Sequence, residues 1–167
     1  MSDMERLVAT TRTDEAYKAK PYRDTRQLWT FANGRCLETH PLTGAEWKFL
    51  LDRNYIDAAI SVAGADVLER QELVAVEVRL AHDYSDFWGR LNAARENALI
   101  EMAYQMGVEH EETFHDMVAT IRVAVASGRD EDWAAVERKG LDSAWAKQTP
   151  ARATRVMDQL RTGDFPP

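Results

Sequence analysis

Residues 17–37 depart from the helical pattern of the rest of the chain, and this departure constrains the fold most. Lys18 to Tyr22 and Leu28 to Phe31 have the composition of two short strands, with a polar, turn-like segment between them. The Asn33-Gly34 pair follows, and both residue types accept the positive φ of a tight turn. The sequence therefore predicts a small twisted hairpin sheet, with a third strand at about Arg35 to Leu37.

A capping box marks the start of the helix after this sheet. Thr43 is followed three positions later by Glu46, so that each side chain can bond the backbone of the other. We expect this helix to end near Gly64. The apolar residues expected to face the core from it are Trp47, Leu50, Leu51, Ile56, Ala59 and Ile60.

Helical spacing of apolar residues also covers 3–14, 66–83 and almost all of the C-terminal half. Residues 74–78, which read Val-Ala-Val-Glu-Val, fit a strand as well. The last helix is expected to begin with Thr149 as its cap and Pro150 at its first position, and to end before Gly163.

These patterns predict an α+β fold that is mostly α, in a single domain over residues 1–167. A small N-terminal lobe would cover about 13–42, a connecting helical region about 43–83 and a C-terminal helical lobe about 84–163. We expect helix 3–14 to pack on the C-terminal lobe. A ligand site is expected in the cleft between the lobes, where such sites commonly lie.

Charge and composition exclude several classes of protein. Residues 31–135 hold nine basic and nineteen acidic residues, whereas nucleic-acid-binding proteins need positive charge to neutralise phosphates. No apolar run reaches the ~20 residues that span a membrane, and the first residues lack the apolar core of a signal peptide. The single cysteine, Cys36, suits a reducing compartment. We expect no nucleic-acid partner and no stable membrane insertion.

Three polar residues at uneven spacing, Glu15, Asp24 and Thr30, are the leading candidates for a catalytic site. Offsets of nine and six match neither a helix face nor a strand face, so these side chains converge only if the chain turns between them. Glycoside hydrolysis commonly uses two carboxylic side chains, one as proton donor and one that attacks the sugar or activates water. We interpret Glu15 and Asp24 as such a pair, with Thr30 holding a water. The alternative is that both are ordinary solvated carboxylates.

Other candidate sites are weaker. His110 and His115 lie five positions apart, whereas the zinc metalloprotease pattern needs histidines four apart on one helix face. No glycine-rich phosphate loop is present. We therefore expect no metal and no cofactor.

Arg152 and Arg155 share one face of the last predicted helix. They either form a solvated surface pair or face Asp14 and Glu15 across the junction between the lobes. In the second arrangement an arginine would favour the charged form of the neighbouring carboxyl.

Two regions carry a recognisable set of motifs. The first holds Asp14-Glu15, Lys20-Pro21-Tyr22-Arg23-Asp24-Thr25 and Trp29-Thr30; the second holds 98–107, Trp133, 145–152 and Arg161-Thr162-Gly163. Together they cover about half of the chain and resemble the phage-type lysozymes of glycoside hydrolase family 24. The Gln-Thr-Pro-x-Arg-Ala motif that begins at Gln148 is the most specific part of the match.

The resemblance implies a two-lobed lysozyme-like fold and a muramidase. Its substrate would be peptidoglycan, cut with inversion at the β-1,4 bond between N-acetylmuramic acid and N-acetylglucosamine. Glu15 would be the general acid, and Asp24, aided by Thr30, would position or activate the attacking water. The further residues that the resemblance implies are Tyr104 and Cys36 as sugar contacts, and Arg152 and Gln105 in supporting positions.

The chain departs from the family pattern in three ways. Ala32 replaces a glycine and Arg35 replaces a histidine just after the threonine, which is expected to reshape the hairpin. Residues 38–90 align poorly, so the connecting helix is either Thr43 to Ala63 or Asp66 to Asp83. The middle of the chain is acidic where well-known members are basic.

The resemblance further implies a monomeric phage endolysin with bacteriolytic, antimicrobial activity in host lysis. It would wait in the host cytoplasm until a holin opens the inner membrane, and then degrade the cell wall from the periplasm. One alternative is a catalytically weakened lysozyme-like module that binds glycan or protein. Another is a phage tail-associated lysozyme, against which the absence of further domains argues.

Overall fold

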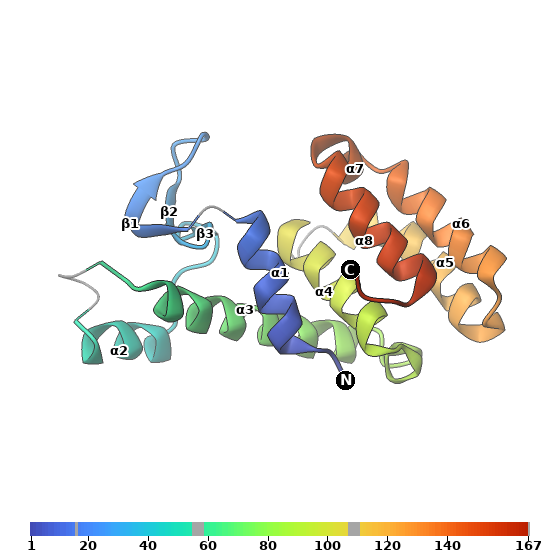
Figure 1. Cartoon of the computed structure of the whole chain (residues 1–167), viewed down its shortest axis with the longest axis horizontal. Coiled ribbons are helices and arrows are strands. Elements are labelled where there is room, and N and C mark those ends of the chain that lie inside the picture. The colour runs from blue at the N-terminus through green and yellow to red at the C-terminus, as the bar shows by residue number, and fades with distance from the viewer. Residues whose placement is uncertain (16, 55–58, 107–110, 167) are drawn as a thin grey trace. The chain divides into compact units, whose positions relative to one another are not determined.

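The computed structural model describes residues 1–15, 17–54, 59–106 and 111–166 of the chain (Figure 1). Their strands are β1 (Lys18–Arg23), β2 (Trp29–Ala32) and β3 (Arg35–Cys36). Their helices are α1 (Met4–Asp14), α2 (Gly44–Asp52), α3 (Val62–Asp83), α4 (Ala93–Met106), α5 (Glu111–Ser127), α6 (Asp130–Leu141), α7 (Ala144–Gln148) and α8 (Pro150–Thr162), with a short 3-10 helix, η1 (Trp88–Arg90). The predicted α+β, mostly helical class is confirmed.

The chain divides into two compact units. One, here the sheet unit, is Val8–Glu72; the other, the helical unit, combines Met1–Leu7 with Leu73–Pro167. The boundary passes through α1 and through α3, so each of these helices contributes residues to both units.

The sheet unit contains a three-stranded antiparallel sheet in the order β1-β2-β3. Thr30 lies in the central strand, opposite Tyr22 on one side and Cys36 on the other. The third strand predicted after the Asn33-Gly34 turn is confirmed. The buried apolar cluster of the sheet unit consists of Phe31, Ala32, Leu50, Ile60, Ala65 and Leu68.

The helix after the sheet begins as predicted and ends earlier than predicted. Thr43 accepts a hydrogen bond from the Glu46 backbone while Glu46 accepts one from the Thr43 backbone, so the capping box is confirmed. However, α2 ends at Asp52. Trp47 and Leu51 are 48% and 63% exposed, so the prediction that they face the core is wrong. Residue 56 of the predicted stripe lies outside the described residues.

The next helix, α3, is continuous from Val62 to Asp83. Gly64 lies inside its first turn, so the prediction that this glycine ends a helix is wrong. Residues 74–78 are helical. Their burial fits a helix, since Val76 is buried on one face while Val74 and Val78, four positions apart, are exposed on another. The alternative reading of this segment as a strand is therefore wrong.

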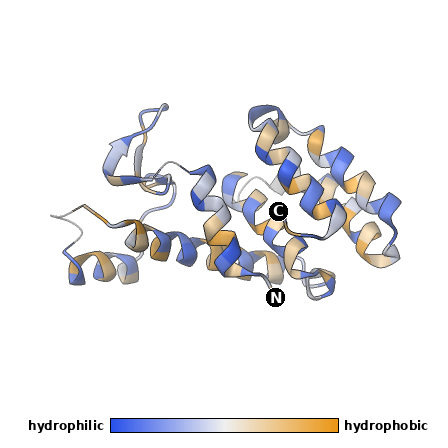
Figure 2. Cartoon of the chain, in the orientation of Figure 1, coloured by the Kyte–Doolittle hydropathy of each residue, from blue (hydrophilic) through white to orange (hydrophobic). Residues whose placement is uncertain are grey.

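In the helical unit, α4 is the central helix. Nearly all of its residues from Ala94 to Ala103 are buried, and α8 packs against it as well as against α6 and α7. The start of the chain is joined to α4 by two hydrogen bonds, from Asp3 N to Asn97 Oδ1 (2.9 Å) and from Asn97 Nδ2 to Asp3 O (2.8 Å). Figure 2 shows hydrophobic and hydrophilic residues alternating along the C-terminal helices, as expected of amphipathic helices around a shared core.

The last helix follows its predicted bounds, with one correction. Gly163, at φ 74°, ends α8 in the left-handed conformation that favours glycine. Thr149 does not cap this helix through its side chain, since its hydroxyl instead donates to the carbonyl of Trp145.

Residues 107 and 110 lie outside the described residues. Within the described residues, no helix combines the length and apolar character needed to cross a membrane.

Candidate functional site

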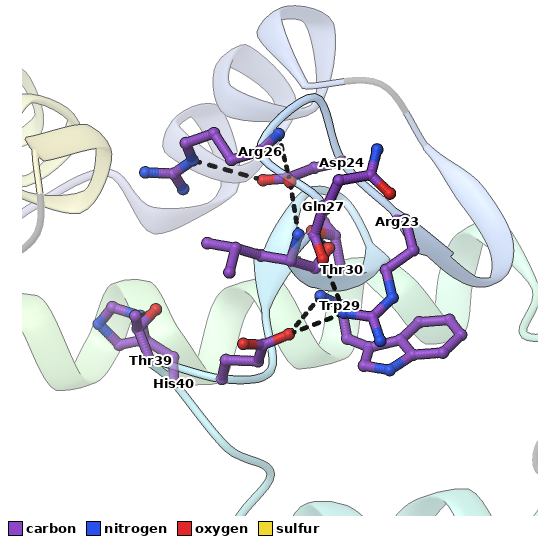
Figure 3. A network of polar contacts seen from close by, with 10 residues as sticks. Arg23, Asp24, Arg26, Gln27, Trp29, Thr30, Thr39 and His40 are labelled. Atoms are coloured by element: carbon purple, nitrogen blue, oxygen red, sulfur yellow. Dashed lines mark hydrogen bonds and ion pairs between the residues drawn. The ribbon is translucent and has the colours of Figure 1, made fainter.

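Asp24 organises the turn between β1 and β2. Its Oδ1 atom accepts hydrogen bonds from the backbone N–H groups of Arg26 (2.8 Å) and Leu28 (2.9 Å). The backbone of Asp24 closes the same turn, accepting from Gln27 N and donating to Leu28 O. Gln27 has a φ of 64°, which lets the chain reverse direction. The turn and the carboxyl group therefore stabilise each other: the backbone N–H groups hold the carboxyl group, and the carboxyl group holds the turn (Figure 3).

These contacts favour the ionised form of Asp24. The hydrogen bond from Leu28 N is the largest cause of a lowered pKa, and the Arg26 backbone and side chain add to it, against a partial desolvation that raises it. Arg26 Nε lies 3.6 Å from Oδ2, and the Asp24 side chain is 21% exposed. An aspartate held as a carboxylate with one oxygen outside the turn suits a base or an electrostatic stabiliser and not a proton donor.

Thr30 is the most buried of the three predicted catalytic residues, with 3% of its surface exposed. Its hydroxyl donates to the carbonyl of Leu28 over 3.3 Å, so its oxygen lone pairs remain able to accept a hydrogen bond. Because Leu28 also donates to Asp24, one residue joins the Asp24 turn to Thr30.

Glu15 directly follows α1, and its backbone N–H continues the helical pattern by donating to Thr11 O (3.0 Å). Its side chain lies against the turn between β2 and β3. A Cβ atom added to Gly34 would come within 2.8 Å of Glu15 Oε2, and the φ of Gly34 is +97°. The positive φ favours glycine at this position, and a larger residue would also displace the Glu15 carboxylate.

Tyr22 connects the three predicted residues. It pairs with Thr30 across the sheet, which places both side chains on the same face. Burial is the largest cause of a raised pKa of the Tyr22 phenol, and the charges of Glu15 and then Asp24 raise it further. Tyr22 thus lies opposite Thr30 and within electrostatic range of Glu15 and Asp24. The catalytic assignment of these three residues stays a prediction.

Cys36, predicted to contact sugar, lies across the sheet from Thr30. Burial would raise the pKa of its thiol, but hydrogen bonds from the Thr39 side chain and from the Thr39 and Glu38 backbone outweigh it and lower the pKa. Cys36 is a half-buried free cysteine. Its contact with a sugar stays a prediction.

Arg35, at the position where the resemblance led us to expect a histidine, is almost buried, with 8% of its side chain exposed. Its guanidinium pairs with Glu46 (2.5 Å) and with Glu72 (2.7 Å). It also donates to the carbonyls of His40 and Pro41. One arginine thus joins the third strand to α2 and α3, and the hairpin keeps its pairing.

The other predicted residues belong to the helical unit. Gln105 accepts a hydrogen bond from Trp145 Nε1 (2.7 Å), which joins α4 to α7. Tyr104 and Arg152 are half-buried. The predicted contact between Arg152 and Glu15 joins residues of different units and stays a prediction. Arg155 does not form a solvated pair with Arg152, because it makes a two-pronged ion pair with the buried Glu101 of α4.

Sequence reasoning did not assign roles to Tyr22, Gly34 or Glu69. Tyr22 was within reach, since it stands two positions before Asp24 in the motif that carries the resemblance. The contact of Gly34 with Glu15 depends on where the end of α1 lies, which no local pattern gives. Glu69, on α3, is only 2% exposed, and it belongs to no recognisable motif.

Known proteins resemble this chain distantly. No protein-family model matches it. The pre-baseplate central spike protein Gp5 of Enterobacteria phage T4 is 28% identical over an alignment of 163 residues that covers 92% of this chain. Probable T4-type lysozymes 1 and 2 of Dictyostelium discoideum are each 24% identical over 160 residues, which cover 90% of this chain and 90% of the relative. The chain spans only 27% of the length of Gp5. These similarities support a phage lysozyme-like relationship.

Proposed function

We propose that this chain is a muramidase of the glycoside hydrolase family 24 type, which hydrolyses β-1,4 bonds between N-acetylmuramic acid and N-acetylglucosamine in peptidoglycan. The observation that carries the proposal is Tyr22 of the sheet unit, which pairs with Thr30 across the sheet and whose phenol pKa is raised by burial and by the charges of Glu15 and Asp24. The relatives named T4-type lysozyme support the same substrate class.

The two carboxyl groups would have different tasks. Glu15, as the acid, donates its proton to the glycosidic oxygen while the bond from that oxygen to the anomeric carbon breaks. Asp24, as the carboxylate, accepts a proton from a water molecule that attacks the anomeric carbon from the opposite face, which inverts the configuration. The Thr30 oxygen accepts a hydrogen bond from the same water and so orients it. Water is the only co-reactant. Glu15 loses one proton and Asp24 gains one, so the protons balance.

The contacts of Asp24 support its assignment as the base. Two backbone N–H groups hold its Oδ1 atom, and Oδ2, which lies 3.6 Å from Arg26 Nε, is the oxygen that would receive the proton. The hydrogen bonds that lower the pKa of Asp24 favour its carboxylate form, which the role of a base requires.

Glu15→Gln and Asp24→Asn test the proposal, with Asp52→Asn as a matched control on the exposed end of α2. The wild type and the control should release reducing sugar ends from purified peptidoglycan. Each active-site variant should lose at least about 100-fold in rate, the scale of general acid–base catalysis. Proton NMR of fresh products should show the α-anomer. Equal rates in wild type and Glu15→Gln, or no hydrolysis by any protein, would reject the proposal.

We further propose that the protein acts as a monomeric endolysin that waits in the host cytoplasm and reaches the wall after a holin opens the inner membrane. A second candidate is a tail-associated lysozyme, which the similarity to the spike protein Gp5 over 92% of this chain favours. Immunoblots of purified phage particles and of cleared lysate separate the two. An endolysin stays in the lysate, whereas a tail protein purifies with the particles.

A further inference from the structure

Three polar side chains are buried together behind the β2–β3 turn. Thr11 of α1 is 2% exposed, Asn33 of the turn 3% and Glu69 of α3 2%. Asn33 Nδ2 donates to Glu69 Oε2 over 2.6 Å, and the Thr11 side chain hydrogen-bonds to the same carboxyl group. The cluster therefore joins α1, the turn and α3 within the sheet unit.

Two atoms of this cluster have no hydrogen-bond partner in the structure. They are Glu69 Oε1 and Asn33 Oδ1, and both are buried. Each is an acceptor while Glu69 is ionised, so neither can satisfy the other. If Glu69 carries a proton on Oε1, that proton can be donated to Asn33 Oδ1. A carboxylic acid and an amide then form two parallel hydrogen bonds, and both orphaned atoms are satisfied.

The charges around Glu69 also favour the protonated form. Burial is the main cause of its raised pKa, and the negative charges of Asp66 and Glu15 raise it further. Arg12, which faces this region from α1, is engaged with Asp66 at 2.9 Å. Thr11 and Asn33 are neutral, and their hydrogen bonds do not offset the burial.

Asn33 connects this cluster to the candidate site. The next residue, Gly34, lies so close to Glu15 that a Cβ atom on it would come within 2.8 Å of Glu15 Oε2. A displacement of the Asn33 side chain would therefore shift the wall against which the Glu15 carboxyl lies.

We propose that Glu69 is a positioning residue that acts as a neutral carboxylic acid, paired with the Asn33 amide, and that this pair holds the β2–β3 turn in place against Glu15. The effect on catalysis rests on the proposed function of Glu15, whereas the acid–amide pair does not.

The proposal predicts the sign of a pH effect on stability. Glu69 has a raised pKa in the folded protein, so the folded protein keeps a proton that the unfolded chain loses near pH 4.5. The stabilisation is fully present below that pH, and it is lost as the pH rises through the folded pKa. Above that point the buried charge repels Glu15 and loses the bond to Asn33 Oδ1.

Two variants of Glu69 and a control separate the possible roles. Glu69→Gln has the same shape and can donate from its amide to Asn33 Oδ1 at every pH. Glu69→Met has a similar volume and leaves the Asn33 amide buried without a partner. Asp52→Asn removes an exposed carboxylate from the same unit.

The first measurements need no activity. A carbon NMR titration of the glutamate carboxyl groups should show a group that titrates above pH 4.5, and Glu69→Gln should remove its signal. Backbone hydrogen exchange in β2 and β3 should become roughly tenfold faster in Glu69→Met, the scale of one lost buried hydrogen bond. In Glu69→Gln it should match the wild type at low pH and become slower than the wild type at high pH.

Hydrolysis of peptidoglycan then tests the positioning role. Glu69→Met should lower kcat about tenfold with little change in KM, and Glu69→Gln should restore it. A Glu69 that titrates near pH 4.5 would overturn the acid–amide pair. An unchanged kcat in a folded Glu69→Met would overturn the positioning role. If the wild type does not cleave at all, the proposed function fails while the titration still decides the pair.

Discussion

Among the described residues, the sheet unit buries seven apolar side chains and the helical unit twenty-five. The sheet unit compensates with polar contacts: Arg35 pairs with two glutamates, and Asn33 is hydrogen-bonded to the buried Glu69. The helical unit has comparable polar pairs, such as Glu101 with Arg155, but they lie around a large apolar core.

This difference bears on how each unit tolerates change. A small unit buries a smaller share of its surface, so it depends more on each specific contact. In the sheet unit the contact of Asn33 with Glu69 also holds the β2–β3 turn, against which the Glu15 carboxylate lies. Stability and site geometry therefore rest on the same residues there, whereas in the helical unit core substitutions can alter stability alone.

The largest effect is expected from Arg35→Met. It leaves the buried Glu46 and the half-buried Glu72 without their cation, and breaking a buried ion pair from one side typically costs about 3–5 kcal/mol. Hydrogen exchange during urea titration should show this loss in residues 8–72. Arg26→Met, at a position 72% exposed, is the control and should cost less than about 0.5 kcal/mol. A small loss in Arg35→Met would show that the sheet unit does not depend on this pair.

Leu160→Ala should weaken the helical unit by about 2–5 kcal/mol, because Leu160 is fully buried on α8 and the change leaves a cavity. The same exchange measurement should show the effect in α4, α6 and α8. Leu141→Ala, at a position 38% exposed, should have a much smaller effect. If activity per folded molecule fell as well, the separation of stability from site geometry in this unit would be wrong.

A pH-dependent effect is expected within the sheet unit from Glu46. Burial raises the pKa of Glu46, but its hydrogen bond to Arg35 and those to Thr43 outweigh burial and lower it. Its stabilisation is therefore present above the ordinary value of 4.5 and is lost as the pH falls through the folded pKa. Thermal unfolding of Glu46→Gln between pH 3 and 7 should show a weaker acid dependence than the wild type. An identical slope in both proteins would contradict this role.

The smallest effect is expected from Ala32→Gly. Ala32 has a φ of 52°, and relief of this conformation favours glycine by about 1 kcal/mol. Loss of the buried methyl group costs about 0.8 kcal/mol, so the two nearly cancel. Ala98→Gly in α4 makes the same chemical change without that relief and should cost about 2 kcal/mol. Equal losses at the two positions would show that the hairpin carries no strain at Ala32.

Local chemistry made part of the fold predictable. The capping box at Thr43 and Glu46 and the turn at Asn33-Gly34 depend on neighbouring residues, and both are confirmed. The end of α2 and the exposure of Trp47 depend on what packs against the helix. Helical spacing shows an apolar face but not whether that face is covered, and the prediction for Trp47 failed for this reason.

The residues of the candidate site were likewise predictable only in part. Glu15, Asp24 and Thr30 could be singled out because they stand in a recognisable motif. The burial of Glu69 could not, because a glutamate in an amphipathic helix normally faces solvent. The role of Thr11 could not be predicted either, since its side chain hydrogen-bonds to a carboxyl group 58 positions away in the sequence.

The path of the chain through the two units has a consequence for folding during synthesis. The sheet unit is one continuous segment, Val8–Glu72, and can form as soon as it leaves the ribosome. The helical unit needs its first seven residues, and Asp3 finds its partner Asn97 only after 94 positions. Closing so long a loop is entropically costly and slow. Residues 1–7 are therefore synthesised before their partner helix and can pack only after α4 has been made.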